Sequence, residues 1–146
     1  MFFSREAQRI RSILVVEDEP LTAFDNEYAL RQAGYRVVAT VDRARDAEAV
    51  IDSGQGVDLV ITDIALRGRR TGIELASHVH ARGIPVLFAT ESFPEEAMTL
   101  GHALGCLAKP YDSRDDLVDA IAVCERLLAG KAPGRLPGSM RLFAIG

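Results

Sequence analysis

The 146-residue sequence predicts an α/β protein with a doubly wound, mainly parallel sheet of five strands in the order 2-1-3-4-5. Short apolar runs rich in β-branched residues alternate along the chain with segments whose apolar residues recur at helical spacing. This alternation is typical of a parallel sheet with helices on both faces. Crossovers between parallel strands are right-handed, and 2-1-3-4-5 is a common strand order for a sheet of five strands.

The clearest strand is the central one, at residues 58–62. Its apolar run of Leu59, Val60 and Ile61 lies between two polar residues, as expected for a strand buried on both faces. The five predicted strands are residues 13–16, 35–40, 58–62, 86–90 and 105–108. In the predicted sheet, all five strands end at the same edge.

Five helices are expected to alternate with these strands. The first begins at Pro20 and carries an apolar stripe of Leu21, Phe24, Tyr28 and Leu30. Asp42 can cap the second helix, and a third follows the loop at residues 67–72. A short fourth helix is predicted to begin at Pro94 and to continue to Leu100. The last helix places Leu117, Ile121, Cys124 and Leu128 on one face.

Composition places this chain among single-domain proteins of the cytoplasm. A net charge of −4 argues against a nucleic-acid-binding surface over the whole domain. No apolar run reaches membrane-spanning length, and the charged residues after Phe3 exclude a signal-peptide core. Cys106 and Cys124 lie in different predicted elements and form no ligand-like pair, so a reducing cytoplasm is the simpler inference.

The last 17 residues, 130–146, differ in composition from the domain predicted at residues 1–129. This tail holds three basic residues, no acids, two prolines and four glycines, and it ends in an apolar run at residues 142–145. One interpretation is a disordered end. The other is an extended arm whose Leu142 and Phe143 dock on the domain or on a partner, which would hide an otherwise exposed apolar patch.

Polar residues stand at four of the five predicted strand ends. The first strand is followed by Glu17 and Asp18 and the central strand by Asp63, the fourth strand ends in Thr90, and the fifth is followed by Lys109. In the predicted order these four strands are neighbours, so we expect their side chains to converge. An isolated aspartate after a strand is commonly a turn or helix cap, but four matched strand ends favour a functional site.

Three converging carboxylates repel one another, and a hard divalent cation relieves that repulsion. Mg²⁺ prefers oxygen ligands and commonly takes one or two carboxylates together with phosphate oxygens. A lysine supplies a compact positive charge for a phosphoryl oxygen, and a threonine hydroxyl can donate to another. Since an aspartate carboxylate can act as a nucleophile, the constellation predicts that Asp63 accepts a phosphoryl group.

The sequence closely resembles a response-regulator receiver domain of the CheY-like type over roughly residues 10–129. The matching segments are ILVVEDEP at 13–20, DLVITDIAL at 58–66, VLFATES at 86–92 and LAKPYD at 107–112. The resemblance implies a flavodoxin-like fold. It also implies a cis peptide bond before Pro110.

By this resemblance, each site residue has a role. Asp63 would be the phosphoacceptor, Thr90 the switch hydroxyl and Lys109 the phosphate-binding lysine. The metal-binding residues would be Asp18, Asp63 and the backbone carbonyl of Ala65, with Glu17 acting on Mg²⁺ through water. The usual partners would be a histidine kinase or phosphotransfer protein and a downstream protein.

The sequence departs from the receiver pattern at two places. Receivers usually carry an aromatic residue three positions before the lysine, where this chain has Cys106. Together with the segment at 88–93, this resembles the single-domain FATGUY receivers, although Glu91 and Phe93 replace their glycine and tyrosine. Such regulators resemble partners of HWE or HisKA2-type kinases. The second departure is the loop Arg67–Arg70, either a solvated basic loop or one that brings an arginine to phospho-Asp63 or the kinase.

These features predict a stand-alone response regulator that signals by protein contact, or that passes phosphoryl groups on as a relay or sink. It would not be a classical enzyme. The first alternative is a pseudo-receiver that binds partners without phosphorylation, which Cys106 leaves open. The second is a metal-dependent phosphatase, and Ala65 argues against it because haloacid-dehalogenase-type enzymes have a second aspartate at that position.

Overall fold

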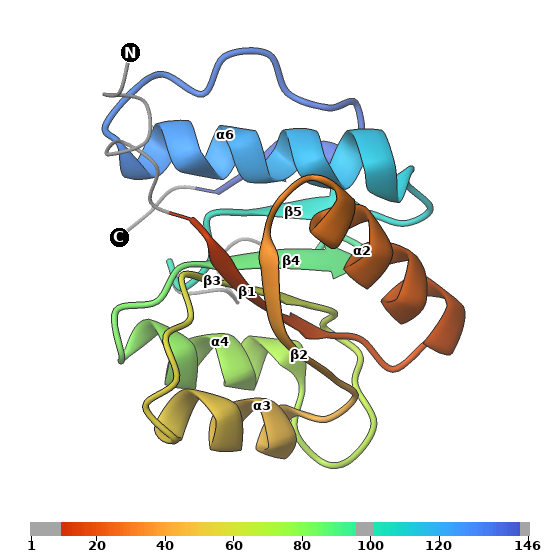
Figure 1. The fold of residues 1–146 in the computed structure, drawn as a ribbon, viewed down its shortest axis with the longest axis vertical. Helices are drawn as coiled ribbons and strands as arrows, with labels where there is room; N and C mark the ends of the chain where they lie inside the picture. The colour runs from red at the N-terminus through yellow and green to blue at the C-terminus, as the bar shows by residue number, and fades with distance from the viewer. Residues whose placement is uncertain (1–9, 96–100, 144–146) are drawn as a thin grey trace.

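The computed structural model describes residues 10–95 and 101–143, which form a six-stranded sheet covered by helices on both faces (Figure 1). The strand order is β2-β1-β3-β4-β5-β6. The strands are β1 (Ser12–Val16), β2 (Arg36–Val41), β3 (Leu59–Thr62), β4 (Val86–Thr90), β5 (Gly105–Ala108) and β6 (Met140–Leu142). The first five are parallel to one another, as predicted, and β3 is buried along its whole length.

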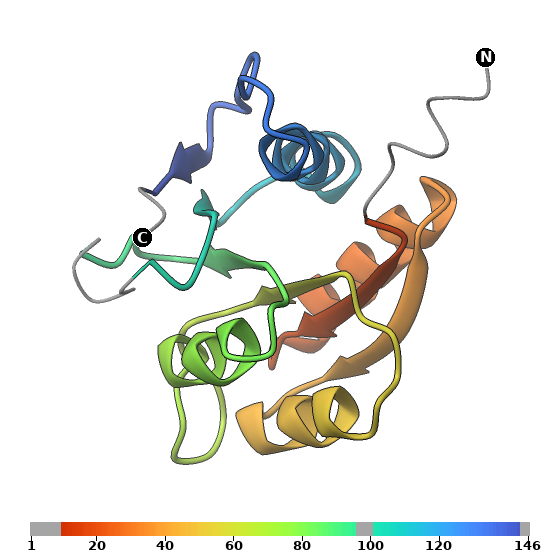
Figure 2. The same ribbon diagram turned by 90° about the vertical axis from the view of Figure 1, so that its left-hand side faces the viewer.

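Four α-helices and one π-helical turn lie in the described part of the chain. They are α2 (Pro20–Gln32), α3 (Ala44–Asp52), α4 (Gly72–His80), η1 (Ser113–Leu117) and α6 (Val118–Leu128). Figure 2 shows α3 and α4 on one side of the sheet and α6 on the other. The buried side chains accordingly fall into two clusters, one under α2 and α6 and one under α3 and α4. This is the doubly wound α/β arrangement that the sequence predicts.

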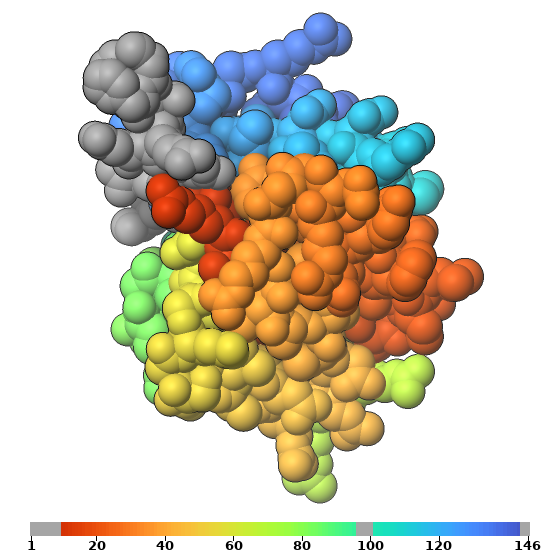
Figure 3. Space-filling view, viewed as in Figure 1, coloured from red at the N-terminus to blue at the C-terminus, as the bar shows by residue number. Residues whose placement is uncertain are grey.

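The apolar stripe predicted for the first helix is wrong for three of its four members. Leu21, Phe24 and Tyr28 are 75%, 68% and 54% exposed, and α2 forms part of the outer surface (Figure 3). The helix instead buries Asn26, Ala29 and Leu30. A polar residue is tolerated there because the Asn26 side-chain oxygen accepts hydrogen bonds from the hydroxyls of Tyr111 and Ser113, at 3.1 and 2.9 Å. Of the predicted stripe, Leu30 alone lies in the core.

The C-terminal tail contributes a sixth strand that the sequence did not predict. β6 pairs antiparallel with β5, so that Gly105 lies opposite Leu142. Gly105 permits the close approach, since a Cβ at this position would lie 2.5 Å from the carbonyl oxygen of Arg141. Met140 and Phe143 are buried in the two different core clusters. Of the two interpretations of the tail, the structure therefore shows the arm that docks on its own domain.

Three smaller expectations have mixed outcomes. The peptide bond between Lys109 and Pro110 is cis, as the resemblance implied. Asp42 does not cap α3, whose N-cap position is Arg43 and has no side-chain capping bond. The helix predicted from Pro94 falls largely on residues 96–100, which lie outside the described residues.

Within the described ranges, no helix has the length and apolar character needed to cross a membrane.

Candidate functional site

The site lies at the carboxyl edge of the sheet, where backbone hydrogen bonds hold neighbouring strand ends together. The amide of Asp63, just after β3, donates to the carbonyl of Val16 at the end of β1 (3.0 Å). The amide of Lys109 donates to the carbonyl of Thr90 at the end of β4 (2.8 Å). The strand ends that sequence analysis grouped are thus adjacent, as expected for this topology.

Three carboxylates gather at this edge. Glu17, Asp18 and Asp63 each offer an oxygen, and these oxygens lie within 4.8 Å of one another. Glu17 is 4% exposed and Asp63 is 6% exposed, whereas Asp18 is half-buried. All three are hard oxygen donors, so the set fits a divalent cation such as Mg²⁺.

The ammonium of Lys109 bridges two of these carboxylates. Its Nζ lies 2.8 Å from Oδ2 of Asp63 and 2.6 Å from Oε1 of Glu17. Burial alone would lower the pKa of Lys109, but hydrogen bonds with Asp63 and Glu17 raise it above its ordinary value. Burial also raises the pKa of Glu17, and the hydrogen bond from Lys109 offsets this in part. Lys109 therefore stays charged and compensates the buried negative charge.

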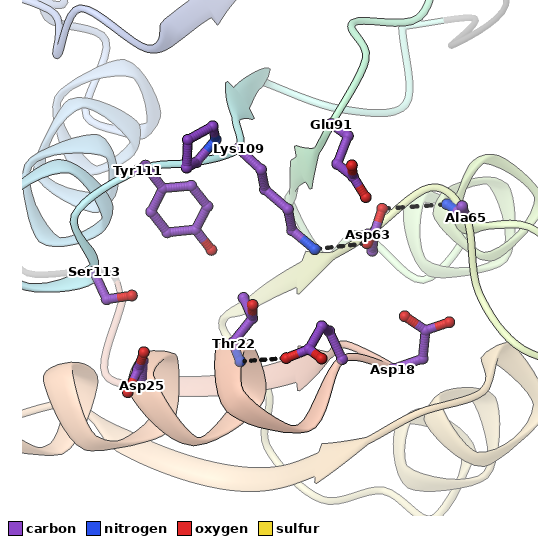
Figure 4. Close-up of a pocket in the computed structure, with 11 residues that line it drawn as sticks. Asp18, Thr22, Asp25, Asp63, Ala65, Glu91, Lys109, Tyr111 and Ser113 are labelled. Atoms are coloured by element: carbon purple, nitrogen blue, oxygen red, sulfur yellow. Dashed lines mark hydrogen bonds and ion pairs between the residues drawn. The ribbon is translucent and has the colours of Figure 1, made fainter.

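A cavity of about 520 Å³ opens directly over Asp63 and Lys109 (Figure 4). Asp18 and Ala65 also line it, and the backbone N–H of Ala65 donates to Oδ1 of Asp63 at 3.2 Å. The cavity leaves Asp63 accessible to a small group although its side chain is almost buried. The predicted role of the Ala65 carbonyl as a metal ligand stays a prediction.

Sequence analysis missed several residues that line this cavity. They are Glu19, Thr22, Asp25, Glu91, Pro110, Tyr111 and Ser113. Figure 4 shows the Glu91 carboxylate pointing toward Asp63. Glu91 could have been found as the residue directly after a predicted strand end, and Thr22 and Asp25 by their helical spacing of three. Thr90 itself is buried at the end of β4 and is not among the lining residues.

Gly72 fixes the backbone behind Asp63. Its amide donates to the carbonyl of Ile64 at 2.7 Å, and a Cβ at this position would overlap the carbonyl of Asp63. Helix α4 starts at this point, with the hydroxyl of Thr71 and the carboxylate of Glu74 forming a capping box. Glycine is thus required for the loop after β3 to fold back so closely against the candidate acceptor.

The loop arginines are not placed against Asp63. Arg70 donates to Glu48 at 2.6 Å, and neither it nor Arg69 lines the cavity over Asp63. Arg67 lines a separate hollow together with Glu17 and Asp18. Of the three loop arginines, Arg67 is thus the one beside the acidic pair, and its approach to a phosphorylated Asp63 stays a prediction.

Fold and site together define the class of this protein: a doubly wound α/β domain with a carboxylate-and-lysine site at the carboxyl edge of its sheet. A family model of the response regulator receiver domain matches residues 13–122. The chain therefore belongs to the response regulator receiver family, whose members serve two-component signalling.

Known proteins similar to this chain agree with that assignment. The transcriptional regulatory protein PdtaR of Mycobacterium tuberculosis is 34% identical over 116 residues, which cover 76% of this chain and 55% of PdtaR. The chain thus spans about half the length of that relative. The signal receiver domain of a modulated diguanylate cyclase from Desulfovibrio desulfuricans has a TM-score of 0.71 and 28% identity, covering 82% of this chain and 98% of that one.

A second solved structure, response regulator TrrA from Thermotoga maritima in complex with Mg²⁺ and BeF, has a TM-score of 0.68 and 25% identity. The matched region covers 77% of this chain and 97% of the TrrA chain. These likenesses confirm the flavodoxin-like fold. They do not test whether the chain belongs to the FATGUY subfamily, so that assignment stays a prediction.

Proposed function

We propose that this receiver acts as a stand-alone phosphoacceptor of a two-component system, in which Asp63 receives a phosphoryl group from a histidine kinase or a phosphotransfer protein. The observation that supports this most strongly is the geometry around Asp63. An almost buried carboxylate faces a cavity, lies 2.8 Å from a lysine ammonium, and shares an oxygen cluster with Glu17 and Asp18. The phosphorylated protein then signals by protein contact or passes the group on.

The chemical step is a phosphoryl transfer between a donor and Asp63. A lone pair of an Asp63 carboxylate oxygen forms the new P–O bond. The P–N bond of the donor phosphohistidine breaks, its electron pair goes to the imidazole nitrogen, and that nitrogen takes up one proton from the buffer, so that neutral imidazole leaves. Lys109 is released from Asp63 toward a phosphoryl oxygen and so neutralises part of the added charge. A bound Mg²⁺ would supply further neutralisation of phosphoryl charge.

The cation would be held by Asp18 and Asp63, the carbonyl of Ala65, and Glu17 through water. Glu17 now accepts hydrogen bonds from Lys109 and from the amide of Glu19 (3.0 Å), which hold its carboxylate at the edge of the cluster. Asp18 is the most accessible of the three carboxylates. This supports Asp18 and Asp63 as direct ligands, with Glu17 contacting the cation through a water molecule.

The signal would leave the site through the loop after β4. Cys106 occupies the position where most receivers have an aromatic residue, and its side chain is fully buried opposite Phe88. Cys106 has no aromatic ring that could change rotamer on phosphorylation. We therefore assign transmission of the conformational change to the loop that carries Glu91 and Phe93. The Arg141 guanidinium of β6 lies 4.7 Å from the Phe93 ring centroid. Movement of Thr90 toward the phosphoryl group would therefore shift Phe93 and alter its contact with Arg141 of β6.

The donor protein would dock on α2. The exposed side chains of Leu21, Phe24 and Tyr28 form an apolar face on this helix, and the Phe24 and Tyr28 rings stack with centroids 6.3 Å apart. Thr22 and Asp25 of the same helix line the cavity over Asp63. A protein that covers this apolar face is thus held beside the acceptor. The segment at 88–93 and Cys106 support the FATGUY type, and with it an HWE or HisKA2-type kinase as the donor.

Mapping of the acyl phosphate tests this function. The full chain is incubated with Mg²⁺ and acetyl phosphate and then reduced with borohydride, which converts an aspartyl phosphate to homoserine. Peptide sequencing by mass spectrometry should find homoserine at position 63 and at no other aspartate. Homoserine elsewhere, or sustained turnover of the phosphodonor with no trapped residue, would favour a different acceptor or a phosphatase.

A further inference from the structure

A second cavity, of about 370 Å³, is lined by five arginines. They are Arg43 and Arg45 at the start of α3 and Arg67, Arg69 and Arg70 of the loop after β3. The whole chain has 17 basic residues against 21 acids, so this concentration of positive charge does not follow from overall composition. It requires an explanation of its own, because the receiver chemistry at Asp63 does not use it.

Four of these five arginines have no carboxylate partner among the described residues. Arg70 is paired with Glu48, its Nη1 lying 2.6 Å from Oε1. Arg43, Arg45, Arg67 and Arg69 form no ion pair within the described ranges, and all four are exposed. Four like charges around one hollow repel each other, and the attraction of each to an anion bound in the hollow would offset this repulsion.

The backbone also favours an anion here. Arg43 and Arg67 pair through an isolated parallel bridge that joins the two segments, and Gly68 takes a positive φ of +92° at the turn of the loop. The first turn of α3 lines the cavity through Ala44 and Arg45, and no side chain caps this amino end, where the helix dipole favours negative charge. Asp46, the acid of that turn, lines the adjoining hollow instead.

We infer that this arginine pocket binds a compact anion that carries several phosphates, such as an inorganic oligophosphate or the phosphate chain of a nucleotide. Guanidinium groups match phosphate oxygens in a bidentate geometry, and a cavity of this volume suits a small ligand.

An extended polyanion such as a nucleic acid fits less well, because acidic groups flank the pocket. Asp18, Asp42 and Asp46 line the hollow on one side, and Glu48 lies beside Arg70.

The ligand would communicate with the receiver site through Arg67, which lines both the arginine pocket and the hollow that contains Glu17 and Asp18. An anion that draws Arg67 into the arginine pocket removes a positive charge from the acidic pair. The pocket is therefore a second, regulatory input that does not depend on phosphorylation of Asp63.

Isothermal titration calorimetry of the full chain with sodium tripolyphosphate tests the pocket, in buffer with EDTA so that no metal takes part. The expected result is saturable binding at one site. The double variant Arg43→Gln/Arg67→Gln should bind about tenfold more weakly or worse, because hydrogen bonds to charged groups are lost. The matched control, Arg36→Gln/Arg135→Gln, removes the same charge from two exposed arginines elsewhere and should bind like the wild type. Asp63→Ala should also bind like the wild type.

Further arms identify the ligand and can overturn the inference. ATP or GTP binding more tightly than tripolyphosphate would assign a nucleotide, and equal or weaker binding an inorganic oligophosphate. The inference fails if no saturable binding occurs, or if the control loses as much affinity as the double variant. It also fails if Asp63→Ala abolishes binding, or if short single-stranded DNA displaces tripolyphosphate at lower concentration, which would indicate an extended polyanion surface.

Discussion

Lys109 donates to Oδ2 of Asp63 at 2.8 Å while its ammonium also lies 2.6 Å from Glu17, so one cation neutralises the two most buried carboxylates of the site. The substitution Lys109→Gln keeps a donor but removes the charge. We expect the rate of phosphorylation by acetyl phosphate to fall roughly 10²-fold, in the range seen when one charge-stabilising donor is removed. Intact-mass time courses measure the rate. Lys131→Gln, an exposed lysine in the tail, serves as the control, and an equal loss there would contradict the role of Lys109.

Gly72 and the Asp63 carbonyl are too close to admit a side chain between them. Gly72→Ala should lower the free energy of unfolding by about 1–3 kcal/mol and also slow phosphorylation, because the loop after β3 must move. Urea unfolding and intact mass measure the two effects. Gly56→Ala is the matched control, since a Cβ there meets nothing within 4 Å. A Gly72→Ala protein with wild-type stability and phosphorylation would show that the loop does not constrain Asp63.

The apolar face of α2 predicts a separation between stability and phosphotransfer. Phe24→Ser should leave the free energy of unfolding nearly unchanged, because Phe24 is mostly exposed, yet it should slow phosphotransfer from a histidine kinase. Phosphorylation by acetyl phosphate should not change. Leu30→Ala, which truncates the buried residue of the same helix, should cost about 2–5 kcal/mol of stability. Equal slowing with both donors for Phe24→Ser would count against the docking face.

The two buried cysteines predict a loss of stability at alkaline pH. Burial raises the pKa of Cys106 and of Cys124 from 9.0 to about 12. Between pH 9.0 and 12 the unfolded thiols lose protons that the folded ones keep, so stability should fall as pH rises, by up to about 1.4 kcal/mol per pH unit for each thiol.

Urea unfolding between pH 9.0 and 10.0 measures this slope, below the ordinary pKa of 10.0 for Tyr111. The variant Cys106→Ala/Cys124→Ala should show a flatter slope, whatever its absolute stability. A slope equal to that of the wild type would mean that these thiols do not control the alkaline dependence.

Most strand positions could be predicted from the sequence because β1, β3, β4 and β5 each contain a short apolar run, and the polar residue at or just after the end of that run marks the site edge. That is why Glu17, Asp63 and Lys109 could be grouped before the structure was known. The packing face of α2 could not be predicted, since Asn26 is buried only because Tyr111 and Ser113, 85 and 87 residues away, satisfy its side chain.

The sixth strand could not be predicted either, because its position also depends on a contact between distant segments. β6 has only three residues and follows a segment rich in proline and glycine, so no local periodicity marks it. Its position depends on Gly105, far away in sequence, which leaves room for Arg141. The arginine pocket likewise depends on a long-range pairing, that of Arg43 with Arg67. Contacts between distant segments, rather than local patterns, carry these features.

Intact mass spectrometry after incubation with acetyl phosphate, with and without Mg²⁺, tests the central claim most directly. Wild-type protein should gain a single phosphoryl group when Mg²⁺ is present and none in EDTA, and Asp63→Ala should gain none under either condition. A wild-type adduct that persists in Asp63→Ala, or no adduct at any donor concentration, would contradict the assignment of Asp63 as the phosphoacceptor.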